Sequence, residues 1–141
     1  MAANHINQHG MKHFARGNLL WLASGGSDVR ICLIDEADDT PLDTDEFRSA
    51  ILAAAIEEDM AAGMTKVDAA VDGVIDGSDV TFLATAGDTC EGVLMYKHDA
   101  GGEGSKNLIA YWGSTTAGQG LPVTLGGDVT VVWNASGILK I

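Results

Sequence analysis

The sequence predicts a mainly β fold, namely a small antiparallel β-sandwich of jelly-roll-like type with a short N-terminal helix and one short internal helix. Short runs of β-branched and aromatic residues recur along the chain, and each is closed by Gly, Ser, Thr or Asn. Glycine is frequent, with 18 residues against 2 prolines, and its clusters indicate many tight turns. No repeat with a period of roughly 20–50 residues is present, which argues against a solenoid.

Length and charge limit the classes of protein and of partner. A chain of 141 residues can bury about two-thirds of its unfolded surface, so we expect one domain over residues 1–141. The net charge is −12 with only 8 basic residues, whereas nucleic-acid grooves and anionic membrane surfaces require clustered Lys and Arg. No apolar run approaches the roughly 20 residues of a membrane span, and no secretory signal is recognised. We therefore expect assembly in the cytoplasm, with no nucleic acid, no membrane and a protein or small-molecule partner.

The first expected element is a short helix within residues 3–16, which lack the alternation of a strand. Gly17 follows as a plausible C-terminal stop. We treat residues 1–21 as an N-terminal helical arm. Its inward stripe is expected to contain Ile6, Gly10, His13 and Phe14.

Three histidines in this arm are the sharpest candidates for a site. His5, His9 and His13 are spaced by four, which would place their imidazoles on one helix face, as a metal site requires. Ligands from one short helix would stack along about two turns, however, and tetrahedral geometry normally needs a ligand from elsewhere. A surface stripe is therefore favoured over a metal site, and a pH-sensitive contact is more economical than catalysis. Together with Phe14 and Trp21, these histidines are our candidate partner-binding residues.

The next elements are a strand, an acidic loop and a helix. Residues 28–35 alternate and predict the first strand, with Val29, Ile31 and Leu33 on one face. Asp43 stands three residues before Glu46, a capping-box spacing that predicts the internal helix. Whether this helix continues through the Ala-rich stretch to Ala62 is left open. Residues 66–75 alternate again and are assigned to strands.

The second half of the chain predicts the rest of the sheet. Residues 98–106 contain three glycines and are expected to form an exposed loop. In the last expected strand, Val129, Val131 and Trp133 share one face. Further strands are expected at residues 79–84, 91–97, 107–113 and 128–134.

Two residue sets allow binding or redox chemistry without requiring it. The acidic loop at residues 35–46 offers oxygen ligands for calcium but lacks the residue order of an EF-hand, so a solvated loop is favoured and no cofactor is expected. Cys32 and Cys90 each lie within an apolar run. A disulfide between them is geometrically possible, but two buried free thiols are the favoured interpretation.

No catalytic motif is recognised, so we expect a protein that is not an enzyme. The serines lie mostly beside glycines in turns, none in a GxSxG elbow, and His98 is the one histidine outside the arm. A pair of carboxylates meeting in space remains possible for a chain with 20 acidic residues. The aromatic residues are interpreted as core and sheet-face residues, although aromatics on a sheet face also bind sugars: Trp21, Trp112, Trp133, Tyr96 and Tyr111.

A series of short motifs suggests a family. Phe14 and Gly17 close the first helix, and the first strand ends in Leu-Ile-Asp followed by Ala37. The motifs that follow in order are DVTF at 79–82, EGVLMY at 91–96, LIAY at 108–111, LPVT at 121–124 and GGDV at 126–129. In this order the chain resembles a family of small virion-associated proteins of tailed bacteriophages and prophages. It departs from the family at Ala53–Ala55, where a Pro is usual, and at Leu125, where Pro or Asn is expected.

The resemblance implies a structural role in the virion. The expected function is that of a capsid decoration or cement protein, which binds the outside of the head shell and stabilises it through protein–protein contacts. Its partner would be the major capsid protein or another virion protein, and the chain itself would be a homo-oligomer, with a trimer as the expected state. The segment up to Trp21 would dock, and the loop at 98–106 would face solvent. A neck, tail or fibre component and a carbohydrate- or host-surface-binding module remain as alternatives.

Overall fold

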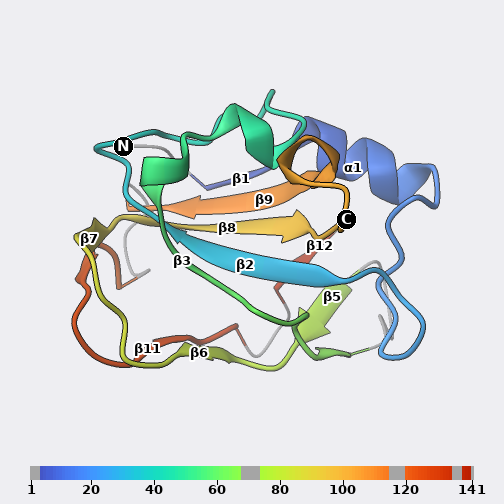
Figure 1. Cartoon of the computed structure of the whole chain (residues 1–141). Helices are drawn as coiled ribbons and strands as arrows, with labels where there is room; N and C mark the ends of the chain where they lie inside the picture. The colour runs from blue at the N-terminus through green and yellow to red at the C-terminus, as the bar shows by residue number, and fades with distance from the viewer. Residues whose placement is uncertain (1–3, 68–73, 115–119, 135–137, 141) are drawn as a thin grey trace.

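The computed structural model describes residues 4–67, 74–114, 120–134 and 138–140. Within these ranges the chain is mainly β, with several antiparallel sheets and one α-helix (Figure 1). The predicted mainly β, antiparallel fold is therefore confirmed.

A five-stranded sheet forms the centre of the molecule. Its strand order is β1 (His5–Ile6), β9 (Leu108–Gly113), β8 (Gly92–Lys97), β2 (Val29–Ile34) and β3 (Ile56–Asp59). The register pairs Val29 with Lys97 across β2 and β8, and Leu94 with Tyr111 across β8 and β9. These three central strands are apolar at nearly every position because both faces of the sheet are covered.

Shorter strands form a second layer on one face of this sheet. One group contains β12 (Leu139–Lys140), β5 (Val74–Gly77) and β4 (Lys66–Val67). Two further pairs are β11 (Val129–Val131) with β6 (Val80–Phe82), and β10 (Val123–Thr124) with β7 (Thr89–Cys90). Figure 1 shows β5, β6 and β11 below the five-stranded sheet. The two layers form the sandwich.

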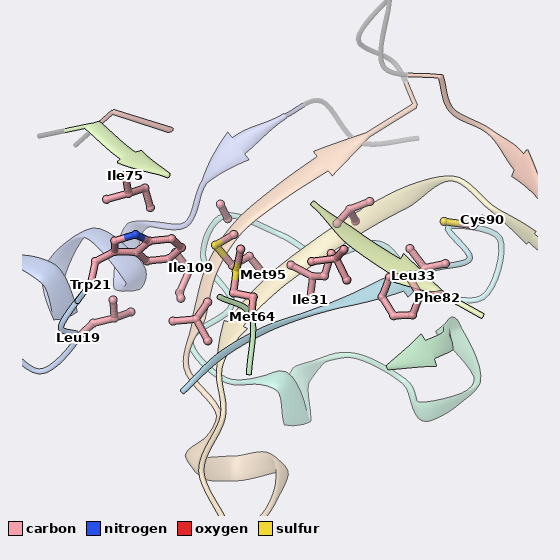
Figure 2. Close-up of a cluster of buried hydrophobic side chains, with 14 of the residues drawn as sticks. Leu19, Trp21, Ile31, Leu33, Met64, Ile75, Phe82, Cys90, Met95 and Ile109 are labelled. Atoms are coloured by element: carbon pink, nitrogen blue, oxygen red, sulfur yellow. The ribbon is translucent and has the colours of Figure 1, made fainter. Parts of the chain in front are cut away.

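The larger apolar core fills the space between the layers, and Figure 2 shows part of it. Ile31, Leu33 and Met95 reach it from the central sheet, and Ile75 and Phe82 reach it from the second layer. Alternate residues of each strand point to this side, so the period of two in the sequence becomes one buried face.

The opposite face of the sheet is covered by helical turns. These are η1 (Arg48–Ala50) and η2 (Ala53–Ala55), and in Figure 1 the segment that contains them crosses above the sheet. A further turn, η3 (Glu103–Ser105), lies in the loop after β8. The smaller apolar cluster on this face contains Cys32, Ile34, Ile51, Ala55, Leu94, Tyr96, Leu108 and Tyr111.

The predicted N-terminal helix is present as α1 (Gln8–Ala15), and the predicted stop at Gly17 has φ +71°. Asn7 caps it by accepting hydrogen bonds from the backbone N–H groups of His9 and Gly10. Gly10 is required by a close approach, because a Cβ there would lie 2.8 Å from backbone atoms of Ile109 in β9. The described part of the expected arm is thus packed against the central sheet.

The predicted internal helix is wrong in type. The chain forms only the two 3-10 turns η1 and η2, because the capping-box residues have other partners. The Asp43 carboxylate accepts a hydrogen bond from Gln8 Nε2 at 2.9 Å, and the Glu46 carboxylate faces the side chains of α1.

The Ala-rich stretch does not continue a helix either. Residues Ile56–Asp59 form β3 and pair with β2 at the edge of the central sheet. The strands expected at residues 66–75 are present as β4 and β5 at either end, while residues 68–73 lie outside the described ranges.

The two cysteines are buried free thiols, as favoured from the sequence. Cys32 lies in the smaller cluster and Cys90 in the larger one, so the central sheet separates them.

Candidate functional site

An apolar cleft of about 570 Å³ lies between the two layers, beside β11. Leu33, Cys90 and Val93 form its floor. One wall contains every residue from 129 to 134 in succession, and the cleft is also lined by Trp112, Gly120, Leu121, Val123 and Ile138. Its volume lies within the roughly 300–1,000 Å³ that is typical of ligand and docking sites.

The cleft exists because the two layers are unequally filled at this end. Leu33 and Val93 are only 1% and 7% exposed, whereas Val129, Val131 and Trp133 on the facing strand are half-buried. The sequence predicts that these three side chains, of β11 and the residues just after it, share one face, and the cleft lining is consistent with that. Fully packed interiors leave few voids larger than a water molecule, so a hollow of this volume is a candidate for contact with another molecule.

Two tryptophans lie together at the cleft. The rings of Trp112 and Trp133 are 5.3 Å apart between centroids and inclined by 54°. The Trp133 side chain is held by a hydrogen bond from Nε1 to the Ser78 carbonyl oxygen at 3.2 Å. Pairs of aromatic rings that also carry a hydrogen-bonding group are typical of contact surfaces.

The described lining of the cleft carries no charge although the chain is strongly acidic. The nearest chemically reactive group is the Cys90 thiol, whose pKa is raised to about 11 by burial. A thiol in this state is inert, so the lining favours binding over chemistry.

An acidic group at another place has the ligand type of a cation site. Carboxylate oxygens of Asp35, Asp38 and Glu57 all lie within 4.8 Å of one another. Burial, followed by the neighbouring Asp35 and Glu36 carboxylates, raises the pKa of Glu91 beside them. The acidic loop was considered for calcium from the sequence, whereas Glu57 comes from β3 and was not part of that hypothesis.

The three histidines do not share one helix face, so that prediction is wrong for His5. This residue belongs to β1, and its ring lies 5.6 Å from the ring of Tyr111. His9 and His13 are on α1 and approach the Glu46 carboxylate at 3.7 and 3.8 Å. The imidazoles therefore point toward two different partners.

His13 is the most constrained of the three. Its Nε2 lies 2.9 Å from the Asn107 side-chain nitrogen, which donates when the imidazole nitrogen is unprotonated. Burial lowers the His13 pKa, Lys12 and Lys97 act in the same direction, and the Glu46 carboxylate opposes them. A pH-sensitive contact at this place remains a prediction.

Phe14 and Trp21 are turned toward the larger core rather than outward. Trp21 is 6% exposed, and its Nε1 donates to the carbonyl oxygens of Val67 at 3.1 Å and Asp76 at 2.9 Å. Its neighbours Leu20 and Leu22 are exposed. Partner binding by the five arm residues remains a prediction. The exposed apolar side chains described near them are those of Met11, Leu20 and Leu22.

A buried polar network at the helical turns was not found from the sequence. Arg48, only 6% exposed, contacts Asp59 at 2.6 Å and Glu103 at 2.8 Å. Its guanidinium lies 4.6 Å from the ring centre of Tyr96, whose hydroxyl donates to Asp59 at 2.6 Å. The four residues are far apart in sequence, so no local signal could have joined them.

No protein-family model matches the chain, and a search of curated proteins finds no match either. Among the described residues, no helix is both long enough and apolar enough to cross a bilayer.

Proposed function

We propose that the chain is a structural protein of a tailed-bacteriophage virion, and specifically a capsid decoration or cement protein. It binds the outside of the head shell, with the major capsid protein or a neighbouring virion protein as partner, and it stabilises the shell through protein–protein contacts. In this proposal the chain acts as a homo-oligomer, with a trimer as the expected state.

The observation that carries the proposal is the apolar cleft, whose described lining residues are uncharged. It combines an inert lining with two adjacent tryptophans, which suits a protein contact better than a reaction. Cement proteins act in many copies, so each contact can be modest while the summed effect is large.

The family-like motifs also support the proposal, because they fall on successive elements of one fold. DVTF at 79–82 contains β6, EGVLMY leads into β8, and LIAY forms most of β9. LPVT contains β10, and GGDV leads into β11. The motifs thus coincide with the strands that build the sandwich rather than with scattered loops.

Quantitative mass spectrometry of purified virions tests the proposal. A copy number approaching that of the major capsid protein is expected for a decoration protein. A handful of copies would instead support a neck, tail or fibre component. Absence from the virion would contradict any structural role.

A carbohydrate- or host-surface-binding module is the second candidate. The Trp112–Trp133 pair could stack on sugar rings, and Asp35, Asp38 and Glu57 could hold calcium beside a glycan. A glycan array and a calcium titration by calorimetry separate the two candidates. A cement protein should give no signal in either experiment.

A point substitution is needed to test whether the N-terminal segment docks on a partner. Deleting residues 1–17 would also remove Asn7 and Gly10, which are packed into the fold. Met11 is 36% exposed on α1, and Met11→Asp adds a charge there while leaving Asn7 and Gly10 in place. Lower virion incorporation of this variant, with Leu52→Asp on a different exposed turn unaffected, would support docking by α1.

A further inference from the structure

We propose that the cleft beside β11 is the surface through which two copies of this chain associate. The inference rests on the proposed structural role in one respect only, namely that a virion protein present in many copies is expected to self-associate. It names a second copy of this chain as the protein that contacts the cleft, which the proposed function leaves open.

Charge is the first argument for a second copy as the occupant. Two copies that each carry a net charge of −12 repel one another over most of their surfaces. They can approach closely only where acidic side chains are missing, and none of the described cleft-lining residues is charged. A basic partner would instead be drawn to the acidic loops, so the neutral cleft favours a partner of like charge.

The acidic residues nearest β11 are already engaged in hydrogen bonds. The Asp79 carboxylate accepts from the backbone N–H of Trp133 at 2.9 Å. The Asp128 carboxylate accepts from the backbone N–H of Ala84 at 2.8 Å. Both acids therefore stabilise the ends of the β6–β11 pair, and the strand between them presents only Val and Thr side chains.

The strand arrangement is the second argument. Within the described residues, β11 pairs with β6 on one side, and its three residues line the cleft together with the next three residues, 132–134. Both the inward-facing Val131 at the end of β11 and the exposed Val132 after it belong to that lining, so the cleft runs along the edge of this segment rather than along one face only. An edge next to apolar side chains is the geometry at which a second chain adds contacts.

The exposed side chains give the third argument. Val132 is 69% exposed although it is large and apolar, and Trp112 and Trp133 are only half-buried. Half-buried aromatic side chains in a neutral pocket are typical of residues that dominate the free energy of association once a partner covers them.

The β6–β11 pair supplies matched variants for the test. Thr130 lines the cleft, while Thr81 lies opposite it in register on β6 and does not line the cleft. Their hydroxyls are hydrogen-bonded to each other at 2.9 Å, so Thr130→Asp and Thr81→Asp remove the same bond and add the same charge. Val132→Asp and Leu83→Asp form a second such pair, because both residues are highly exposed and only Val132 lines the cleft.

The experiment is sedimentation velocity of the purified full chain and of the four variants, from about 1 μM to about 1 mM. Circular dichroism and urea unfolding confirm that each variant is folded. We expect the wild-type chain to self-associate and the two cleft variants to raise its dissociation constant on the order of a hundredfold, because each buries an unpaired carboxylate. Leu83→Asp should stay within about threefold of wild type, because its added charge does not line the cleft and is largely screened. Thr81→Asp should weaken association less than Thr130→Asp, because its carboxylate lies beside the cleft lining and not in it.

Salt dependence is a second readout. Added sodium chloride should strengthen the association, because it screens the repulsion between two acidic copies while leaving apolar contact intact. Weaker association at high salt would instead indicate an ion-paired interface elsewhere and would overturn the inference.

Two further results would overturn it. One is a wild-type chain that stays monomeric over the whole concentration range. This holds even if the monomer binds the neutral apolar dye N-phenyl-1-naphthylamine in the cleft. The other is equal weakening by the cleft and the control variants. Virion copy number is measured separately, so a monomer that is abundant in virions would overturn only this inference. An associating chain that is absent from virions would overturn only the proposed function.

Discussion

The two faces of the central sheet are covered in different ways. The closed face, under η1 and η2, has a small apolar cluster whose rim is fixed by polar contacts, with Arg48 paired to Asp59 and the Tyr111 hydroxyl donating to Glu36 at 2.7 Å. The open face, toward β6 and β11, has the larger apolar core and ends in the cleft. Polar contacts of defined geometry fix one arrangement of the covering segment, whereas apolar contact without such partners leaves room for another molecule. The closed face of the sheet is thus held rigid by polar contacts, and the open face is the one on which we propose binding.

On the closed face, the free energy of unfolding should be most sensitive to substitution of Gly92 in β8. A Cβ at this position would overlap the phenol ring of Tyr111, which is fully buried. Gly92→Ala is therefore expected to lower the free energy of unfolding by about 3 kcal/mol, measured by urea denaturation. Gly104→Ala is the control, because a Cβ there meets nothing within 4 Å. Equal stability of the two variants would mean that Tyr111 is not tightly packed.

The next largest effect is expected at the Arg48 network. Arg48→Met leaves the Asp59 and Glu103 carboxylates without their cation and should cost about 2 kcal/mol of unfolding free energy. This is below the value for a fully buried pair because both carboxylates are partly exposed, at 35% and 46%. Arg30→Met, which breaks the short-range pair with Asp28, is expected to cost under about 1 kcal/mol. A reversed order in thermal or urea unfolding would show that the Arg48 network contributes no more to stability than an ordinary surface ion pair.

Enlarging one side chain on each face tests the difference in packing directly. Ala55 is fully buried on the closed face, so Ala55→Leu should destabilise the fold by about 1–2 kcal/mol. Val131 faces the cleft, so Val131→Leu should change stability by no more than about 0.5 kcal/mol. Urea midpoints of the two variants give the comparison. A large loss of stability in the Val131→Leu variant would show that the open face is already tightly packed.

The smallest effect on stability is expected when a fall in pH protonates His13. Because burial lowers its pKa from the ordinary 6.5, the neutral imidazole is favoured in the fold. The stability that it contributes is complete above pH 6.5 and is lost as the pH falls toward the lowered value. Urea midpoints between pH 8 and pH 5 should therefore fall less steeply for His13→Gln than for wild type. Equal slopes for wild type and His13→Gln would contradict the prediction.

The sequence predicted the elements whose signals are local. The strands β2, β8 and β9 combine β-branched and aromatic residues with turn residues at both ends, and α1 ends at a glycine of positive φ. The edge strands β1 and β3 were missed because their residues, HI and IEED, have no strand signal of their own. Pairing with a distant neighbour determines their conformation.

The candidate sites show the same limit. Spacing placed three histidines on one helix face, but tertiary pairing moved His5 to a strand. The Arg48 network joins residues from four separate segments, and the cleft results from how two layers fill a volume. The sequence did contain the alternation of Val129, Val131 and Trp133, although it could not show that this face would be only half covered.

The position of β1 next to β9 affects how the protein is made. A ribosome releases His5 and Ile6 about a hundred residues before Ala110 and Tyr111, their partners in the sheet. Until the last of those residues emerges, α1 has no strand to cover, and Asn7 cannot donate its N–H to the Ile109 carbonyl oxygen. The central sheet therefore closes only late in translation, and the nascent N-terminal segment is the stretch we expect chaperones or proteases to reach first.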